Sequence, residues 1–243
     1  MTEGLTHTAI DFTQQYFLLR KSEGRIYSDK EVAGLPAIDK EHKHFYEWQV
    51  RKDSSNRLVK YLLKKKKAFK ILEVGCGNGW LSAKLSAISL SRVTGIDINS
   101  EELNQAKRVF SQIENLEFFN CSLQDEIVSD RQFDIIVFAA SIQYFSSLEK
   151  VLGESLKVLK PGGEVHIIDS HLYKQNETDA ARLRSHDYYN AIGFPEMNDQ
   201  YFHHSLEGLK SFNHDILYDP GSIINKFKKN KNPFYWICIR SNA

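Results

Sequence analysis

The sequence predicts an α/β fold built around a mainly parallel sheet. Between residues 69 and 169, short β-prone segments alternate with segments of helical periodicity, the order that parallel strands with crossover helices require. One β-prone segment, Phe133–Ala139, is almost wholly apolar, as expected of a central strand buried on both faces. A glycine-rich turn at residues 75–79 joins the first strand of this series to a helix, and such a turn favours a bound ligand.

Length and composition are those of an ordinary globular protein. The 243 residues suffice for one large α/β domain, or for one domain with an appended cap. The net charge of +1 gives no general attraction to nucleic acid or to a membrane, and no apolar run approaches the length of a membrane span. The N-terminus lacks the regions of a signal peptide, and Cys76, Cys121 and Cys238 show no zinc-type spacing. We therefore expect a cytoplasmic protein with reduced thiols and no metal site.

The first quarter of the chain predicts a helical lid. Residues 1–45 are polar, dotted with aromatic side chains and broken by glycine and proline, so we expect short helices and loops that cover another part of the molecule. A longer helix is predicted over Phe45–Leu63, and it ends in Lys64–Lys67, whose charges suit the negative end of the helix dipole. We divide the chain accordingly into a helical lid at residues 1–65 and a second domain at residues 66–243.

Five strands are predicted in the order of a parallel sheet. They are Ile71–Val74, Arg92–Ile98, Leu116–Phe119, Phe133–Ala139 and Glu164–Asp169. After the second strand, Asn99 is the expected cap of a helix, with Glu102 three residues later. A further helix is predicted over residues 147–159, and the Lys-Pro-Gly-Gly segment at 160–163 stops it before the fifth strand.

The chain beyond residue 169 departs from this rhythm. Residues 170–212 hold many aromatic and histidine side chains among polar residues, and we interpret them as a substrate-cap insertion above the strand ends. Such a cap favours an enclosed pocket over an open groove for a polymer. Two further strands are predicted near His214–Tyr218 and Phe234–Ile239, on either side of a lysine-rich loop.

The glycine-rich turn discriminates between nucleotide-like ligands. Its pattern is E-x-G-x-G-x-G, in which Glu73 ends the strand and Gly75, Gly77 and Gly79 follow at alternate positions. A dinucleotide fingerprint, G-x-G-x-x-G, would need its third glycine where Trp80 stands. A fixed carboxylate also repels a pyrophosphate, whereas it attracts an ammonium group. The turn therefore favours a ligand with a cationic group over a nicotinamide dinucleotide.

On these residues the chain resembles the class I (Rossmann-like) S-adenosylmethionine-dependent methyltransferases, of the small-molecule type. The resemblance covers residues 69–169 in five ordered parts: the glycine loop, the acid on the next strand, the turn after the third strand, the FDIIV strand and the LKPGG segment. It implies a three-layer sandwich whose seven-stranded, mostly parallel sheet is closed by an antiparallel terminal hairpin. It also implies S-adenosylmethionine as the cofactor, whose ammonium and sulfonium groups suit Glu73.

The resemblance assigns cofactor contacts to individual residues. Asp97, 22 positions after Gly75, would accept hydrogen bonds from the ribose hydroxyls, and an acid that caps the next helix is the alternative. The family usually has an adenine-binding acid at the position of Asn120, whose oxygen would take that role beside the Cys121 N–H; an Asx turn is the alternative. Arg51 would meet the methionine carboxylate unless it forms a surface ion pair. The predicted cofactor-binding set is Glu73, Gly75, Cys76, Gly77, Gly79, Asp97, Ile98, Asn120, Cys121, Ala139 and Arg51.

The acceptor side is predicted from the segment after the fourth strand and from the cap. Residues 139–145 lie where the family places its methyl-transfer machinery, so Tyr144 would position an acceptor or the sulfonium; aromatic packing beneath the cap is the alternative. The N/D-P-P-Y motif of enzymes that methylate DNA bases is absent there. His171, His203 and His204 are candidate general bases, and polar histidines of the cap are the alternative.

The sequence therefore predicts an enzyme that transfers a methyl group to an oxygen or nitrogen atom of a small or medium soluble metabolite. Neither a membrane nor a nucleic acid is an expected partner. One alternative is a methyltransferase that acts on RNA or protein through the lysine runs Lys64–Lys67 and Lys226–Lys231. The other is a protein that binds the cofactor without catalysis.

Overall fold

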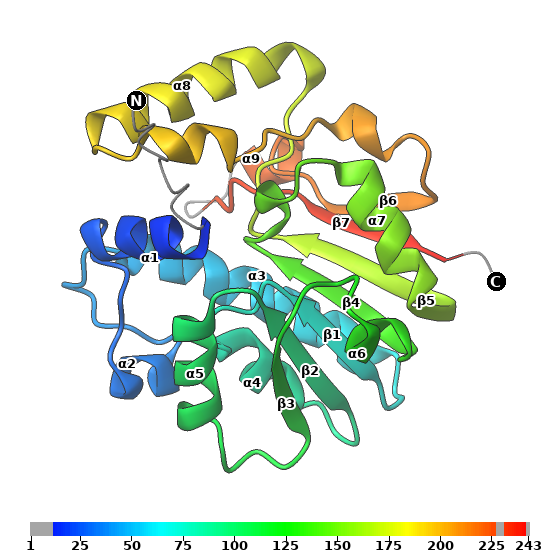
Figure 1. Cartoon of the computed structure of the whole chain (residues 1–243). Coiled ribbons are helices and arrows are strands. Elements are labelled where there is room, and N and C mark those ends of the chain that lie inside the picture. Colours follow the sequence, from blue (N-terminus) through cyan, green and yellow to red (C-terminus); the bar gives the residue numbers. More distant parts are fainter. Residues whose placement is uncertain (1–11, 227–230, 242–243) are drawn as a thin grey trace, which may run out of the picture.

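The computed structural model describes residues 12–226 and 231–241 and shows a sheet covered by helices on both faces (Figure 1). Within these ranges the sheet has seven strands, in the order β3-β2-β1-β4-β5-β7-β6. They are β1 (Lys70–Val74), β2 (Arg92–Asp97), β3 (Leu116–Asn120), β4 (Phe133–Ala139), β5 (Leu159–Ile168), β6 (His214–Tyr218) and β7 (Trp236–Arg240). The first five strands pair in parallel, and β7 runs antiparallel to β5 and β6. The predicted sheet and its terminal hairpin are thus confirmed.

The helices pack on the sheet through two apolar clusters. The α-helices are α1 (Phe12–Ser22), α2 (Asp29–Gly34), α3 (Phe45–Lys64), α4 (Trp80–Ser86), α5 (Ser100–Val109), α6 (Glu126–Ser129), α7 (Leu148–Lys157), α8 (Thr178–Ala191) and α9 (Ile223–Lys226). The 3₁₀ helices are η1 (Ile142–Tyr144), η2 (Gln175–Glu177), η3 (Pro195–Asp199) and η4 (Leu206–Leu209). In one cluster, Leu58 of α3 and Leu81 of α4 pack with Ile71 of β1. In the other, Leu152 of α7 packs with Ile136 of β4.

The predicted lid consists of helices with two different surroundings. The helix expected over Phe45–Leu63 is confirmed as α3, and its buried Leu58 and Leu62 make it part of the sandwich itself. The shorter α1 instead buries Leu19 against the cap. Residues 1–11 of the predicted lid lie outside the described residues. The N-terminal helices therefore connect the sandwich to the cap.

Two local details differ from the sequence prediction. The fifth strand begins at Leu159, which pairs with Phe133, and the next pair is Ile135 with Glu164. An irregularity in this register absorbs the Lys-Pro-Gly-Gly segment inside the strand, so the segment does not precede it. Asn99 caps α5 as expected by accepting from two backbone N–H groups, but the Glu102 side chain makes no return bond to the cap.

Residues 170–212, the segment interpreted as a cap, lie next to the carboxyl ends of the parallel strands (Figure 1). The cap contains α8 and η3, and a bridge between Tyr173 and Ser205 closes its base. Leu19 of α1 packs with Tyr189 and Met197 of the cap, so two segments far apart in the chain lie side by side above the sheet (Figure 1). Within the part of the chain that the structure describes, no helix is long and apolar enough to cross a membrane.

Candidate active site

A cavity of about 450 Å³ lies at the carboxyl ends of β1, β2 and β4. Part of its lining, which we call the loop wall, comes from β1, β2, the glycine turn and the start of α5: Glu73, Gly75, Gly77, Asp97 and Glu102. Another part, which we call the aromatic wall, comes from α1, η1 and the cap: Phe12, Tyr16, Arg20, Tyr144 and Gln200. The volume falls within the range of small-molecule sites, about 300–1,000 Å³.

The glycine loop passes so close to the turn after β4 that a side chain has no room. Gly75 has a φ of +73°, and a Cβ placed on it would lie 2.6 Å from the Cβ of Ser141. Ser141 is fixed there because its Oγ donates a 2.6 Å hydrogen bond to the Val74 carbonyl. Glycine at this position therefore follows from both the backbone conformation and the close approach.

Asp97 holds the loop in place from the end of β2. Its two carboxylate oxygens accept hydrogen bonds from the backbone N–H groups of Gly77 and Asn99, both at 2.7 Å. Burial raises the pKa of Asp97, while these backbone bonds oppose that rise. Because Asn99 is itself the residue that caps α5, the cap alternative for Asp97 does not match the structure. The carboxylate faces the cavity and orders the loop.

Two further acids make the loop wall receptive to a cation. Burial raises the pKa of Glu73 to about 8, and Asp97 adds to the effect; the Glu73 side chain accepts a short hydrogen bond from Ser82. Glu102 lies against the loop, 3.5 Å from where a Cβ on Gly77 would stand, and burial together with Asp97 raises its pKa to about 7. A positive group of a ligand would lower the cost of ionising these carboxyls.

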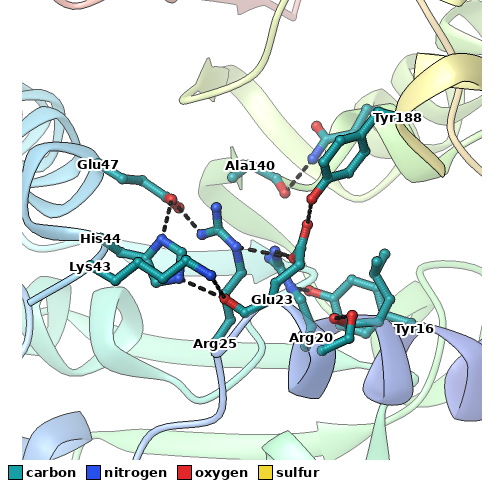
Figure 2. A network of polar contacts seen from close by, with 12 residues as sticks. Tyr16, Arg20, Glu23, Arg25, Lys43, His44, Glu47, Ala140 and Tyr188 are labelled. Atoms are coloured by element: carbon teal, nitrogen blue, oxygen red, sulfur yellow. Dashed lines mark hydrogen bonds and ion pairs between the residues drawn. The ribbon is translucent and has the colours of Figure 1, made fainter. Parts of the chain in front are cut away.

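An ion-pair chain of alternating charge runs along the N-terminal side of the cavity, and Figure 2 shows most of it. Its members are Arg20, Glu23, Arg25, Glu47 and Arg51. Glu23 lies 3.3 Å from Arg20 and 3.1 Å from Arg25, while Glu47 pairs with Arg25 and, at 3.0 Å, with Arg51. Burial opposes ionisation of Glu47, but the two arginines outweigh it and lower its pKa to about 2. The chain carries three positive and two negative charges.

Glu23 is the centre of this network (Figure 2). Besides its two arginines, its carboxylate accepts a hydrogen bond from the Tyr188 hydroxyl of α8. Its backbone carbonyl accepts one from Lys43 Nζ at 3.0 Å and lies 3.0 Å from His44 Nε2. The single residue thus joins the end of α1 to the start of α3 and to the cap.

The aromatic wall is a cluster of rings with one cation. The ring of Tyr144 lies 5.4 Å from that of Tyr16 and 5.8 Å from that of Phe12, measured between centroids. Arg20 donates from Nε to the Tyr16 hydroxyl at 2.9 Å. Ala140 precedes Tyr144 in a turn with a φ of +55°, which is uncommon for a non-glycine residue and marks backbone held under strain. Packed aromatic rings and the constrained turn at Ala140 are suited to positioning a ligand.

A family model described as a methyltransferase domain matches residues 65–237, which is more than half of the chain. The chain belongs to the class I S-adenosylmethionine-dependent methyltransferases. This confirms the family that the sequence resembles, and S-adenosylmethionine is the cofactor of that family, as predicted.

Curated relatives of this methyltransferase match part of its length. The demethylmenaquinone methyltransferase of Chlorobaculum tepidum is 35% identical over 100 residues, 41% of this chain and 40% of the relative. The malonyl-[acyl-carrier protein] O-methyltransferase of Priestia megaterium is 32% identical over 96 residues, 39% of this chain and 34% of the relative. The chain therefore spans between a third and two fifths of the length of these two relatives.

A solved structure extends the likeness of fold to almost the whole methyltransferase. The magnesium protoporphyrin IX methyltransferase of Synechocystis PCC 6803, crystallised with bound S-adenosylmethionine, has a TM-score of 0.59 and 11% identity. The match covers 98% of this chain and 100% of that one. The similarity at this identity is one of fold, and it includes the N-terminal helices and the cap.

The residues of the loop wall fit S-adenosylmethionine. The glycine loop lines the cavity through Gly75 and Gly77, and the carboxyl groups of Glu73, Asp97 and Glu102 line it beside the loop. Burial raises the pKa of Glu73 to about 8 although Arg51 opposes this rise, so a ligand ammonium beside it would favour the ionised carboxylate. A pyrophosphate there would meet the Asp97 carboxylate and no positive group of the loop wall, which disfavours a dinucleotide.

Most of the predicted site residues meet at the cavity. Its lining includes nine of the predicted cofactor residues and one predicted acceptor residue: Arg51, Glu73, Gly75, Cys76, Gly77, Asp97, Ile98, Cys121, Ala139 and Tyr144. Five other predicted residues are not part of this lining: Gly79, Asn120, His171, His203 and His204.

Local packing explains why the two predicted loop residues lie elsewhere. A Cβ on Gly79 would stand 2.5 Å from the Phe118 ring, so this glycine lets α4 begin close to β3. The exposed Asn120 donates from Nδ2 to the Asp97 carbonyl at 2.9 Å, which ties the ends of β2 and β3 together.

Two of the three predicted histidine bases, His203 and His204, have polar partners in the cap and in η1, and the third, His171, packs against the rings of Tyr173 and Phe234. His203 Nε2 lies 2.8 Å from Ser185 Oγ, and His204 Nε2 lies 3.1 Å from the Ile142 carbonyl. Burial lowers the pKa of both. Their position matches the alternative of polar cap histidines, with His204 tying the cap to η1.

Several cavity residues were not predicted. Tyr16, Arg20 and Arg25 come from a segment whose weak periodicity indicated only a cover. Glu102 was interpreted as a partner of the helix cap, and its side chain turns to the loop instead. The one available signal for Arg20 was the pairing of an aromatic residue and an arginine one helical turn apart, Tyr16 and Arg20.

A buried group of possible metal ligands lies away from the cavity, between β5 and β7. Ligand atoms of Glu164, His166 and Cys238 lie within 4.8 Å of one another. However, His166 Nδ1 accepts a hydrogen bond from Trp236 Nε1 at 3.1 Å, whereas a ligating histidine normally keeps a proton on its second nitrogen. Lys65, 2.9 Å from Glu164, adds a positive charge beside it. The group forms a buried polar network without the features of a metal centre.

Proposed function

We propose that this chain transfers the methyl group of S-adenosylmethionine to an oxygen or nitrogen atom of a small or medium-sized metabolite. The observation that carries the proposal is that one cavity joins the loop wall to the aromatic wall. The relatives named above, a demethylmenaquinone and a malonyl-[acyl-carrier protein] methyltransferase, support transfer to a metabolite-like acceptor. Bound S-adenosylmethionine supplies a methyl group on a positively charged sulfur, which is an activated leaving group.

We assign the contacts to the cofactor as follows. Glu73 would bind its ammonium group, and Asp97 its ribose hydroxyls, because these carboxylates line the cavity beside the loop. Arg51 would bind its carboxylate, since it reaches the cavity as the last member of the ion-pair chain. The Cys121 backbone would meet adenine from the turn after β3.

The lid and the cap would supply orientation and exclude water. Residues 1–65 and 170–212 both contribute side chains above the strand ends, and Glu23 with Tyr188 joins them. Holding two reactants in line can lower the barrier by roughly 7–11 kcal/mol. Tyr144, on the aromatic wall, would position the acceptor or the sulfonium.

An RNA or protein acceptor has less support. Lys64–Lys67 follows α3 and precedes β1, so it lies at the amino ends of the parallel strands, opposite the cavity. Lys65 there pairs with Glu164, and Lys67 lies over the Phe69 ring. Part of the second lysine run, Lys226–Lys231, lies outside the described residues. The three cysteines are unpaired, which supports a reducing, cytoplasm-like compartment.

Two measurements test the proposal. Calorimetric titration should show binding of S-adenosylmethionine and S-adenosylhomocysteine, and little binding of NAD. Methyl-labelled S-adenosylmethionine incubated with the protein and pools of small metabolites should then label a small molecule. Binding of NAD alone would contradict the assignment of the cofactor, and binding without any labelled product would favour the non-catalytic alternative.

A further inference from the structure

The aromatic wall contains the guanidinium group of Arg20, and some of its N–H groups make no hydrogen bond to the described residues. Arg20 uses Nε for the Tyr16 hydroxyl and Nη1 for Glu23, at 2.9 and 3.3 Å. Its guanidinium carbon lies 5.0 Å from the centroid of the Tyr16 ring. Among the described residues, Nη2 makes no hydrogen bond, and Arg20 lines the cavity. A ligand in the cavity can therefore reach free N–H groups of a fixed cation.

The positive charge of Arg20 is only partly compensated. Its ion-pair partner, Glu23, is shared with Arg25 and also accepts from Tyr188. The ion-pair chain to which it belongs has one more positive than negative charge. Glu47 and Glu102 also interact electrostatically with Arg20, but Glu47 is paired with Arg25 and Arg51, and Glu102 lies against the glycine loop. An anion at the aromatic wall would therefore meet a guanidinium whose paired carboxylate, Glu23, is shared with a second arginine.

We propose that the methyl acceptor is an organic acid, and that Arg20 binds the carboxylate that becomes methylated, with Tyr16 and Tyr144 beside it. This inference rests on the proposed function and names its substrate class. A guanidinium presents parallel N–H groups that match the two oxygens of a carboxylate. The rings of Phe12 and Phe145, which also line the cavity, suit the apolar part of such an acid.

The chemistry of this transfer needs no base. A carboxyl group is already ionised near neutral pH, so no proton has to leave the acceptor. One carboxylate oxygen forms a bond to the methyl carbon, the carbon–sulfur bond breaks, and its electron pair stays on the sulfur. The negative charge of the acid and the positive charge of the sulfonium both disappear. In agreement, no histidine or lysine occurs among the described residues that line the cavity.

Binding to the protein loaded with S-adenosylhomocysteine tests the role of Arg20 without turnover. The probes are two acid–amide pairs, benzoate with benzamide and octanoate with octanamide, titrated by calorimetry. The acids should bind more tightly than their amides. Arg20→Met should weaken the binding of the acids on the order of 10- to 100-fold, because it removes charged hydrogen bonds. The binding of the amides should change little, because methionine keeps a long side chain. Arg20→Lys should retain part of the preference.

The matched control is Lys21→Met, which removes an exposed cation from the next position of α1. It should bind all four probes as the wild-type protein does. Acids that bind no better than their amides, or that bind equally to Arg20→Met, would overturn the inference.

The product of transfer gives an independent test. Label from methyl-labelled S-adenosylmethionine should enter the acids as methyl esters, which release volatile methanol in alkali, whereas methyl ethers and methylamines do not. Label found only in alkali-stable products, or in none of the acids, would overturn the inference and leave the proposed function standing if another small molecule is labelled. A protein that binds neither sulfur cofactor would contradict the proposed function itself.

Discussion

The two walls of the cavity are built in different ways. The loop wall comes from residues 73–102, and backbone hydrogen bonds to Asp97 and close packing at Gly75 hold it. The aromatic wall joins α1 to η1 and Gln200, more than 100 residues away, through ring contacts and the ion-pair chain. The first is fixed by one short piece of chain, and the second exists only when distant segments meet. Substitutions in the loop wall should therefore change stability and cofactor affinity more than substitutions in the aromatic wall do.

The largest effect expected is the pH dependence carried by Glu73. Its pKa rises from 4.5 in the unfolded chain to about 8 in the folded protein. The folded state therefore prefers the protonated form, and this contribution to stability is complete below pH 4.5 and is lost as the pH rises through 8. The free energy of unfolding of the cofactor-free protein should fall by up to about 5 kcal/mol over that range. Urea denaturation at several pH values measures it.

The control for this prediction is Glu73→Gln, which keeps a side chain of the same shape without the titrating group. Its unfolding free energy should lack this component of the pH dependence. An equal slope in the two proteins between pH 4.5 and 8 would show that Glu73 is not the group responsible.

The next largest effect concerns Asp97. Asp97→Ala removes the two bonds that order the glycine loop and the carboxylate assigned to the ribose. Each hydrogen bond to a charged group contributes about 1.5–3 kcal/mol, so S-adenosylhomocysteine should bind at least tenfold more weakly, as measured by calorimetry. Asp97→Asn should lie between this variant and the wild type. A folded Asp97→Ala protein with unchanged affinity would refute the assignment.

A smaller effect is expected where the lid meets the cap. Tyr188→Phe removes the hydroxyl that donates to Glu23, at a cost of about 1 kcal/mol. Because this bond joins α1 to α8 and leaves the sandwich untouched, hydrogen exchange of α1 amides should become faster while exchange in β1 and β4 stays the same. Tyr46→Phe, which alters a tyrosine that is 83% exposed on α3, is the control. Equal exchange of α1 in all three proteins would show that the contact does not hold the lid.

The smallest effect on transfer is expected for the cap histidines. His203→Ala and His204→Ala remove groups bonded to Ser185 and to the Ile142 carbonyl, outside the cavity lining. The pH profile of methyl transfer should persist in both variants, although His204→Ala should lower stability by about 1 kcal/mol. Removal of a general base would instead lower the rate of transfer by about 10²–10⁴ and would change the pH profile.

The sequence predicted the loop wall because its signals are local. The spacing of Glu73, Gly75 and Gly77 and the acid at Asp97 lie within a single strand–helix–strand unit, where the pattern of side chains follows directly from the backbone. The strands were predicted for the same reason, except that the start of β5 depends on pairing between Leu159 and Phe133.

The aromatic wall was predicted only in part because its contacts span the chain. Tyr144 was found from its place after β4, but nothing near Arg20 in the sequence indicates that α1 packs against η1. His203 and His204 were predicted as general bases because of their residue type. Only the fold shows that they contact Ser185 and the Ile142 carbonyl. Glu102 looked like a capping residue until the fold placed it against Gly77.

Removing α1 tests most directly whether the two walls act separately. Deletion of residues 1–22 takes away Phe12, Tyr16 and Arg20, and neither of the two apolar clusters on the sheet contains a residue of α1. The measurement is calorimetric titration of the truncated protein with S-adenosylhomocysteine, followed by benzoate and octanoate. We predict binding of S-adenosylhomocysteine close to that of the full chain and no binding of the acids. Loss of S-adenosylhomocysteine affinity as large as in Asp97→Ala would contradict the separation of the two walls.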